Sequence, residues 1–125
     1  MRQALLLSTL ILSATPLLAH HNASHTYDAE KPVPLDGTVT AVHWKNPHVL
    51  VYVDVKSDGG NVVNWKVELV GPIGGMVRLG LTKEAFHVGD PISLTACVAK
   101  DGTHTAAARA VTVPSAMENK RVGIC

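Results

Sequence analysis

The sequence has no cluster of charged side chains of one sign. Eleven Lys and Arg stand against ten Asp and Glu, so the formal net charge is +1 at pH 7. If Arg2 is removed with an N-terminal leader, ten basic and ten acidic side chains are left. Phosphate recognition draws most of its affinity from clustered Lys and Arg. The composition therefore argues against nucleic acid as a partner.

The sequence also has no long apolar run after its first segment, whereas a membrane span takes about 20 apolar residues. The chain begins Met-Arg-Gln and is then mainly apolar over residues 4–18. A basic start, a short apolar stretch and a small residue before the cut are typical of a signal peptide. We predict a signal peptide over residues 1–19, and a periplasmic or secreted bacterial protein that is not integral to the membrane after cleavage. Leu17 is less typical than Ala three positions before the mature end, so an uncleaved leader or a shifted cut is the alternative.

Cysteine is scarce, with only Cys97 and Cys125 in the whole chain. They do not form a Cys-x-x-Cys redox motif, and an oxidising compartment would let them pair. We therefore predict one intramolecular disulfide between them. Two free thiols, or a Cys125 that pairs with another molecule, are the alternatives.

Spacings typical of catalytic sites are missing as well. The histidines do not form a His-Glu-x-x-His motif, and no serine has the context of a nucleophile elbow. The acidic residues fall mostly in turns or on alternating polar faces, where solvent would surround them. We predict that the protein is not an enzyme but a non-catalytic binding module, whose ligand is an unidentified small molecule or protein partner.

Apolar and polar side chains alternate along much of the chain, as is typical of half-buried β-strands. Three strands are expected first, over residues 33–44, 48–55 and 62–69, with turns rich in Asn, Pro, Asp and Gly between them. The side chains expected to point inward are Val33, Leu35, Val39 and Ala41, then Val49, Val51, Val53 and Val55, and then Val63, Trp65, Val67 and Leu69.

The pattern changes after the third strand. Pro72 can begin a helix and Gly80 can end one, so a short helix is expected over residues 71–80. Two glycines inside that segment make the helix weak. Thr82 can cap one further turn.

Two more strands are expected over residues 91–99 and 105–113. Three strands, a short helix and two strands are the element order of the OB-fold. We therefore predict an all-β protein with one short helix, folded as a small five-stranded OB-like Greek-key barrel over residues 33–114. The C-terminal tail, residues 115–125, shows no period and is expected at the surface.

Several motifs resemble those of an uncharacterised family of small exported bacterial proteins, a domain of unknown function. The similarity covers most of residues 19–114. It rests on the N-terminal His-His, an acidic-Lys-Pro entry to the first strand, a Trp-x-Asn-Pro-His turn and an Ala-Lys-Asp-Gly turn. The resemblance implies export and a β-barrel but no particular activity. Cys97 and Cys125 depart from the family's usual pattern, so the resemblance does not support the disulfide.

Three of the chain's seven histidines, His20, His21 and His25, follow the predicted cut directly. Cleavage after Ala19 would give His20 a free α-amino group beside its imidazole, and copper(II) prefers such nitrogen ligands. A second imidazole would complete the site, either from His21 or His25 or, in the folded domain, from His43 or His48. A copper(II)-binding carrier or chaperone is therefore the alternative function. The N-terminal segment, residues 20–32, is expected to be mobile. Its histidines could therefore also be a solvated tail that binds nothing.

The segment HWKNPH (43–48) is the second candidate region. Asn and Pro in its centre fix a turn, which would hold His48 at the mouth of the barrel. Because the chain has few aromatic residues, two tryptophans near this turn stand out. We predict a ligand-binding face made of Trp44, His48 and Trp65, on the strands with which OB-like barrels bind their ligands. The alternative is a turn-stabilising His48 with Trp44 packed beside it.

Overall fold

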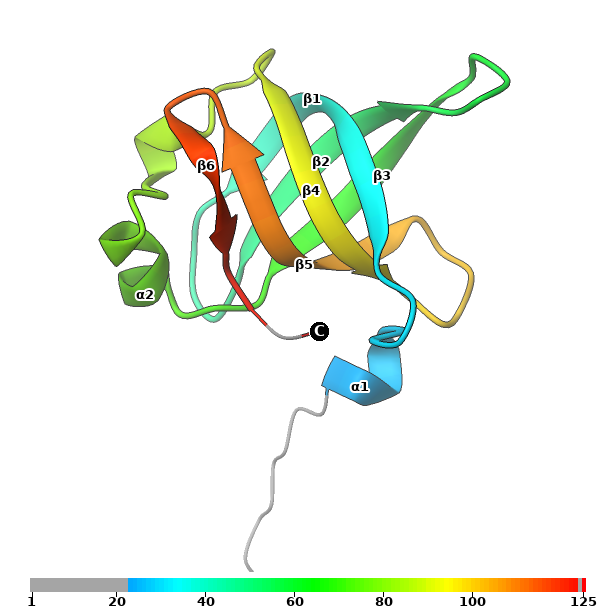
Figure 1. The fold of residues 1–125 in the computed structure, drawn as a ribbon, viewed down its shortest axis with the longest axis horizontal. Helices are drawn as coiled ribbons and strands as arrows, with labels where there is room; N and C mark the ends of the chain where they lie inside the picture. Colours follow the sequence, from blue (N-terminus) through cyan, green and yellow to red (C-terminus); the bar gives the residue numbers. More distant parts are fainter. Residues whose placement is uncertain (1–22, 124) are drawn as a thin grey trace, which may run out of the picture.

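The structure is a computed structural model and describes residues 23–123 and 125 (Figure 1). The predicted signal peptide and the candidate metal ligands His20 and His21 lie outside the described residues. A short helix, α1 (Ala23–Thr26), comes first. The strands are β1 (Val33–His43), β2 (Val49–Lys56), β3 (Val62–Leu69), β4 (Pro91–Val98), β5 (Thr105–Val113) and β6 (Ala116–Arg121).

The strands form one sheet in the order β3-β2-β1-β4-β5-β6, and β3 also pairs with β5. The β3–β5 pairing is parallel, whereas all the other pairings are antiparallel. Because β3 meets β5, the first five strands close into a barrel, as Figure 1 shows. This is the connectivity of an OB-like Greek-key barrel. The predicted fold class is therefore confirmed.

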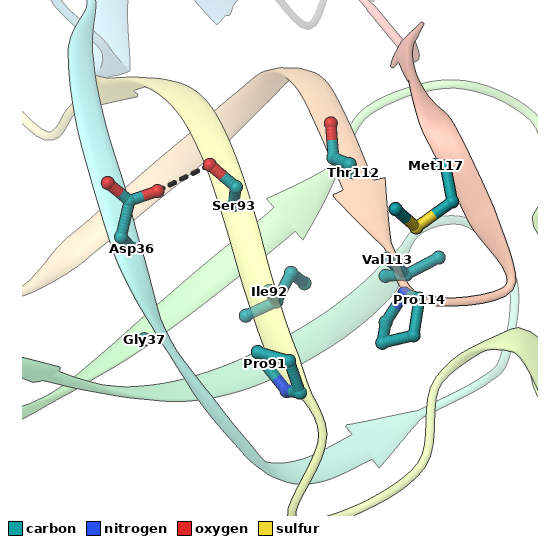
Figure 2. Close-up of a pocket in the computed structure, with 9 residues that line it drawn as sticks. All are labelled: Asp36, Gly37, Pro91, Ile92, Ser93, Thr112, Val113, Pro114 and Met117. Atoms are coloured by element: carbon teal, nitrogen blue, oxygen red, sulfur yellow. Dashed lines mark hydrogen bonds between the residues drawn. The ribbon is translucent and has the colours of Figure 1, made fainter.

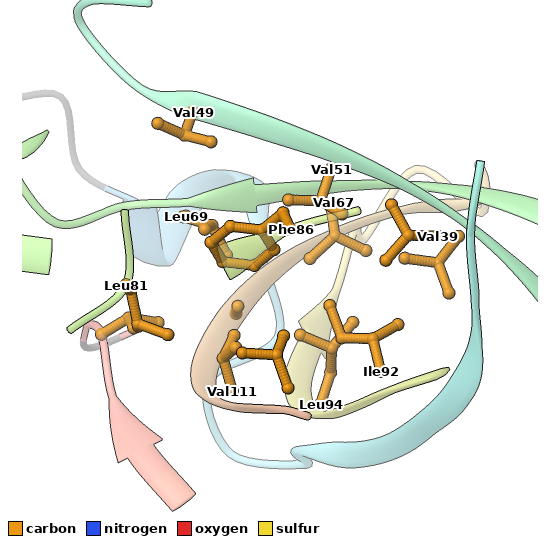
Figure 3. Packing of buried hydrophobic residues seen from close by; sticks show 14 of the residues in the cluster. Val39, Val49, Val51, Val67, Leu69, Leu81, Phe86, Ile92, Leu94 and Val111 are labelled. Carbon is orange, nitrogen blue, oxygen red and sulfur yellow. The ribbon is translucent and has the colours of Figure 1, made fainter. Parts of the chain in front are cut away.

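The core of the barrel consists mainly of valines and leucines that alternate along the strands. Val49, Val51 and Val53 of β2 are completely buried, as are Val67 and Leu69 of β3. Figure 3 shows Val49, Val51, Val67 and Leu69 converging on core residues from the other strands. Burying such a side chain stabilises the fold by about 1.5–3 kcal/mol relative to leaving it exposed. The period-two pattern therefore gave the correct inward face for β2 and for the end of β3.

One predicted inward residue of β1, Ala41, was wrong because the strand contains a bulge. The pairing of β1 with β2 shifts between Val39 and Ala41, so Thr40 is an extra residue in the strand. Such a residue reverses the alternation of side chains beyond it. Val42, rather than Ala41, therefore packs against the core.

The predicted helix is present and lies beside one end of the barrel (Figure 1). It is α2 (Ile73–Arg78), with Pro72 as its N-cap. Gly80 follows with a φ of 80°, a left-handed conformation that glycine adopts without strain. A 3-10 turn, η1 (Lys83–Ala85), begins after Thr82, as expected. The buried side chains of this segment are Met76, Leu81, Ala85 and Phe86.

The C-terminal segment is more regular than predicted. Residues 116–121 form β6, which pairs with the second half of β5 through Ala110↔Arg121 and Val111↔Lys120. The pairing is possible because β3 covers β5 only as far as Ala108. The tail was expected only to lie at the surface, and its aperiodic sequence did not indicate this additional strand. Its sequence shows no period because most β6 side chains are exposed on both faces.

Candidate functional site

A second, smaller apolar cluster lies outside the barrel core. It contains Tyr27, Cys97, Ala99, Ala107 and Cys125, all of them buried. Cys97 and Cys125 form a disulfide with their Cα atoms 5.9 Å apart, which confirms the predicted pair. The disulfide holds the end of the chain against the barrel wall, and Figure 1 shows that end near α1.

Tyr27 anchors the segment that precedes the first strand. It forms an isolated antiparallel bridge with Ala99, and the next residue, Asp28, donates its backbone N–H to the carbonyl of Val98 at 2.9 Å. Tyr27 is 7% exposed. The predicted N-terminal segment, residues 20–32, thus has a fixed point that the sequence did not reveal.

The hydroxyl of Tyr27 donates a hydrogen bond of 2.8 Å to Oε2 of Glu68. Burial is the largest cause that raises the pKa of Tyr27 well above its usual value, and the bond to Glu68 adds to it. Both effects favour the neutral phenol, because a phenolate would be poorly solvated and would face a carboxylate. Tyr27 is therefore a fixed hydrogen-bond donor to Glu68.

The other carboxylate oxygen of Glu68, Oε1, is bonded to Nδ1 of His48. An ionised carboxylate only accepts hydrogen bonds, so Nδ1 carries the hydrogen and donates it. The lone pair of a neutral imidazole is then on Nε2, at the other side of the ring. The side chain of His48 is 34% exposed. In a neutral His48 ring, Nε2 is the atom left for a ligand, and no residue in the described part of the chain is bonded to it.

Strand register explains why these residues meet. Val49 pairs with Leu69 and Leu50 pairs with Glu68, so the turn that ends at His48 comes next to the end of β3. Val67 and Leu69 point into the core, and Glu68 between them points outward. Tyr27, His48 and Glu68, which we call the Tyr-Glu-His group, thus lie on the outer wall of the barrel.

The three residues of the predicted binding face, Trp44, His48 and Trp65, each have different contacts in the structure. Both tryptophans are half-buried and pack against the barrel core. The ring of Trp44 lies 6.1 Å from that of Phe86, and the ring of Trp65 lies 5.1 Å from that of His104. His48 instead contacts Glu68 on the outer wall.

Sequence reasoning missed Tyr27 and Glu68 as members of the site. Glu68 was expected to be solvated, because it alternates with apolar residues along a strand. The Tyr27–Glu68 bond joins positions 41 residues apart, and no local pattern signals such a contact. The only hint is the position of Glu68, which precedes the end of β3 at a strand–loop boundary.

A second pair of histidine and carboxylate provides a comparison. Nδ1 of His87 lies 3.1 Å from Oδ2 of Asp90, three positions later in a turn. The side chain of His87 is 65% exposed, about twice the value for His48. In the described part of the chain no tyrosine is bonded to this pair, and it lies far along the sequence from the N-terminal histidines.

The described residues, 23–123 and 125, include His25 and His48 of the candidate metal ligands. In that part of the chain, no three His, Cys, Asp or Glu side chains lie close enough together to hold a metal ion. His25 is exposed at the end of α1, two positions before Tyr27. A metal at His48 would therefore need ligands that the described residues do not bring together. The same part of the chain has no helix long and apolar enough to cross a membrane.

Comparisons with known proteins identify a family for this chain, but they do not indicate an activity. A family model described as a family of unknown function (DUF6152) matches residues 8–108. No curated protein and no solved structure matches the chain. The matched range includes the Tyr-Glu-His group and Cys97 but ends before Cys125.

Proposed function

This chain belongs to a family of unknown function, DUF6152, and we propose that it is a non-catalytic module that binds copper(II) through His48 and histidines of its N-terminal segment. The observation that carries the proposal is the bond between Glu68 and Nδ1 of His48, which leaves Nε2 free. A carboxylate in this position is the usual outer partner of a metal-bound histidine, because it fixes the ring and raises the basicity of the ligand nitrogen.

The choice of copper(II) follows from the type of ligand atoms. Imidazole and amine nitrogens suit copper(II), which also takes the highest place in the usual affinity order of divalent metals. The only two cysteines are joined in a disulfide, so no thiolate is available in the described residues to favour a softer ion.

The additional ligands are proposed to come from His20, His21 and His25. Tyr27 is bonded to Glu68, so the N-terminal segment enters the fold beside the partner of His48. His21 precedes Tyr27 by six residues, and a chain of that length spans at most about 20 Å. His20 would add its α-amino group if the chain is cut after Ala19.

We further propose that the protein acts after export, in the periplasm or outside the cell. The Cys97–Cys125 disulfide supports an oxidising compartment. Intact mass and N-terminal sequencing of the exported protein test this proposal. A mature chain that begins at His20 is the expected result, and a chain that keeps residues 1–19 would contradict it.

The metal site is tested by calorimetric titration of copper(II) into the metal-free protein. His48→Ala is expected to weaken binding at least about 10-fold, because a first ligand is lost. His87→Ala is the matched control, since it also removes a histidine bonded to a carboxylate, and it should change nothing. Equal affinities of the His48→Ala variant and the unchanged protein would overturn the role of His48.

Glu68→Gln separates a positioning role from a structural one. The amide can still contact Nδ1 of His48, but it no longer supplies the negative charge that strengthens the ligand. A loss of copper affinity of about 10-fold or more is expected, with the melting temperature of the metal-free protein recorded alongside. A lower melting temperature with unchanged copper affinity would show that Glu68 is only structural.

A further inference from the structure

A groove runs over the outer surface of the barrel where β1, β4, β5 and β6 lie next to one another (Figure 2). Its volume is about 460 Å³, which lies within the usual range for sites that bind small molecules. It lies at the Pro91 end of β4, whereas Tyr27 is bridged to Ala99, beyond the other end of that strand. The groove therefore shares no residue with the proposed copper site.

Most of the groove is apolar. Its exposed apolar side chains include Pro91 at the start of β4 and Pro114 directly after β5. Ile92 and Val113 also line the groove, but they are almost completely buried in the core. Met117 of β6 covers one side of it, as Figure 2 shows, and remains 82% exposed. An exposed methionine next to a hollow apolar surface is a flexible wall that can adjust to the shape of a ligand.

Polar groups occupy one side of the groove. Asp36 of β1 accepts a hydrogen bond from the hydroxyl of Ser93, and Thr112 follows on β5 (Figure 2). Register places these three side by side, because Asp36 pairs with Ser93 and Ser93 pairs with Thr112. No Lys, Arg or His is among the lining residues. The groove thus combines an apolar surface with a single negative charge whose position is fixed by a neighbouring hydroxyl.

We propose that this groove binds a small hydrophobic cation, an organic amine whose ammonium group faces Asp36 and whose apolar body covers Pro91, Pro114 and Met117. Charge complementarity with Asp36 favours a cationic ligand over an anionic or a neutral one. An anionic amphiphile would bring a second negative charge next to Asp36, and a neutral one would leave that carboxylate without a charged partner. Because Asp36 is exposed to solvent, most of the affinity should come from apolar contact, and the charge should determine selectivity.

The test uses octylammonium as the probe, with octanol and octanoate as its neutral and anionic counterparts. Each is titrated into isotopically labelled protein below its micellar concentration, with a chelator present so that copper is absent. Octylammonium is expected to shift the amide signals of Asp36, Ser93, Thr112 and Met117 in a saturable way. Octanol should bind several-fold more weakly and octanoate more weakly still. Equal binding of all three, or no saturable shift, would overturn the proposal.

Two variants locate the contacts. Asp36→Asn keeps the acceptor for Ser93 but removes the charge, so it should weaken octylammonium several-fold and leave octanol unchanged. Met117→Ser should weaken both. Asp58→Asn and Val62→Ser are the controls, because they change an exposed carboxylate and an exposed apolar side chain outside the groove.

A second copy of the chain is the competing occupant. Shifts of the same groove signals with protein concentration alone, without any probe, would show that another molecule of this protein covers the groove. That result would overturn the proposal of an amine site.

Discussion

Tyr27 donates its hydroxyl hydrogen to Glu68, which follows it by 41 positions, and this bond ties the segment before the barrel to the third strand of the barrel. The same carboxylate is bonded to His48. Glu68 thus connects the place where the N-terminal segment meets the barrel to a histidine with a free ring nitrogen. Glu68 therefore orients that histidine and adds a side-chain contact to a segment that backbone hydrogen bonds near Val98 also hold in place.

The stability of the protein should fall at high pH because of Tyr27. Its pKa in the folded protein lies above the value of about 10 for an unfolded chain. The neutral phenol therefore stabilises the fold fully below about pH 10. That stabilisation is lost as the pH rises further, because the unfolded chain releases the proton while the folded chain retains it.

Urea unfolding between pH 9 and pH 11, on metal-free protein, measures this effect. Tyr27→Phe should unfold at lower urea concentrations at pH 8, by about 1 kcal/mol for the lost hydrogen bond, and should show a weaker decline above pH 10. Tyr52→Phe serves as the control, since it removes the other tyrosine hydroxyl. Parallel pH profiles for the Tyr27→Phe variant and the unchanged protein would contradict the prediction.

Reduction of the disulfide should destabilise the protein without unfolding it completely. Cys97 and Cys125 are 28 positions apart, and closing a loop of that length stabilises a fold by about 3–4 kcal/mol through the entropy of the unfolded chain. The difference in unfolding free energy between the oxidised protein and a Cys97→Ser/Cys125→Ser variant measures it. A disulfide-linked dimer on a non-reducing gel would show that Cys125 pairs between molecules instead.

Trp44→Ala should lower stability and leave copper binding unchanged. Trp44 packs against Phe86 and the core, and truncating a fully buried tryptophan costs about 3–5 kcal/mol. Because Trp44 is only half-buried, a loss of about 2 kcal/mol is expected. Thermal unfolding and copper titration of the same sample test both parts. Unchanged stability combined with weaker ligand binding would instead make Trp44 part of a binding face.

The proposed copper site requires a free α-amino group on His20 if that amine is one of its ligands. If the amine of His20 is a ligand, one added Gly in front of it should weaken copper(II) binding by at least about 10-fold, because the amine and imidazole no longer belong to one residue. Bound copper should also be released below about pH 6, where protons compete for imidazole. Equal affinities with and without the added Gly would remove the amine from the site but not His48.

The sequence predicted the barrel because its strands have one buried face. Val49, Val51 and Val53 recur at every second position, and Pro72 and Gly80 mark the ends of the helix by their backbone preferences. Such local signals are sufficient when a strand or helix follows a regular period.

Non-local pairing explains what the sequence did not predict. The extra residue Thr40 is visible only against the register of β2, and it changes which side chains of β1 face the core. The bond between Tyr27 and Glu68 likewise depends on where distant segments of the chain meet. The candidate site was therefore half predicted, through His48, while the residues that orient His48 emerged only from the three-dimensional arrangement.

The strand β6 determines which backbone and side-chain groups are exposed at the edge of the sheet beside β5. Without it, the second half of β5, an apolar stretch that includes Ala110, Val111 and Val113, would present unpaired backbone groups. Such an edge is a template for aggregation. With β6 in place, the exposed edge of the sheet is β6 itself, which carries the charged residues Glu118, Lys120 and Arg121. A chain that ends before residue 116 should therefore self-associate, even with its barrel intact.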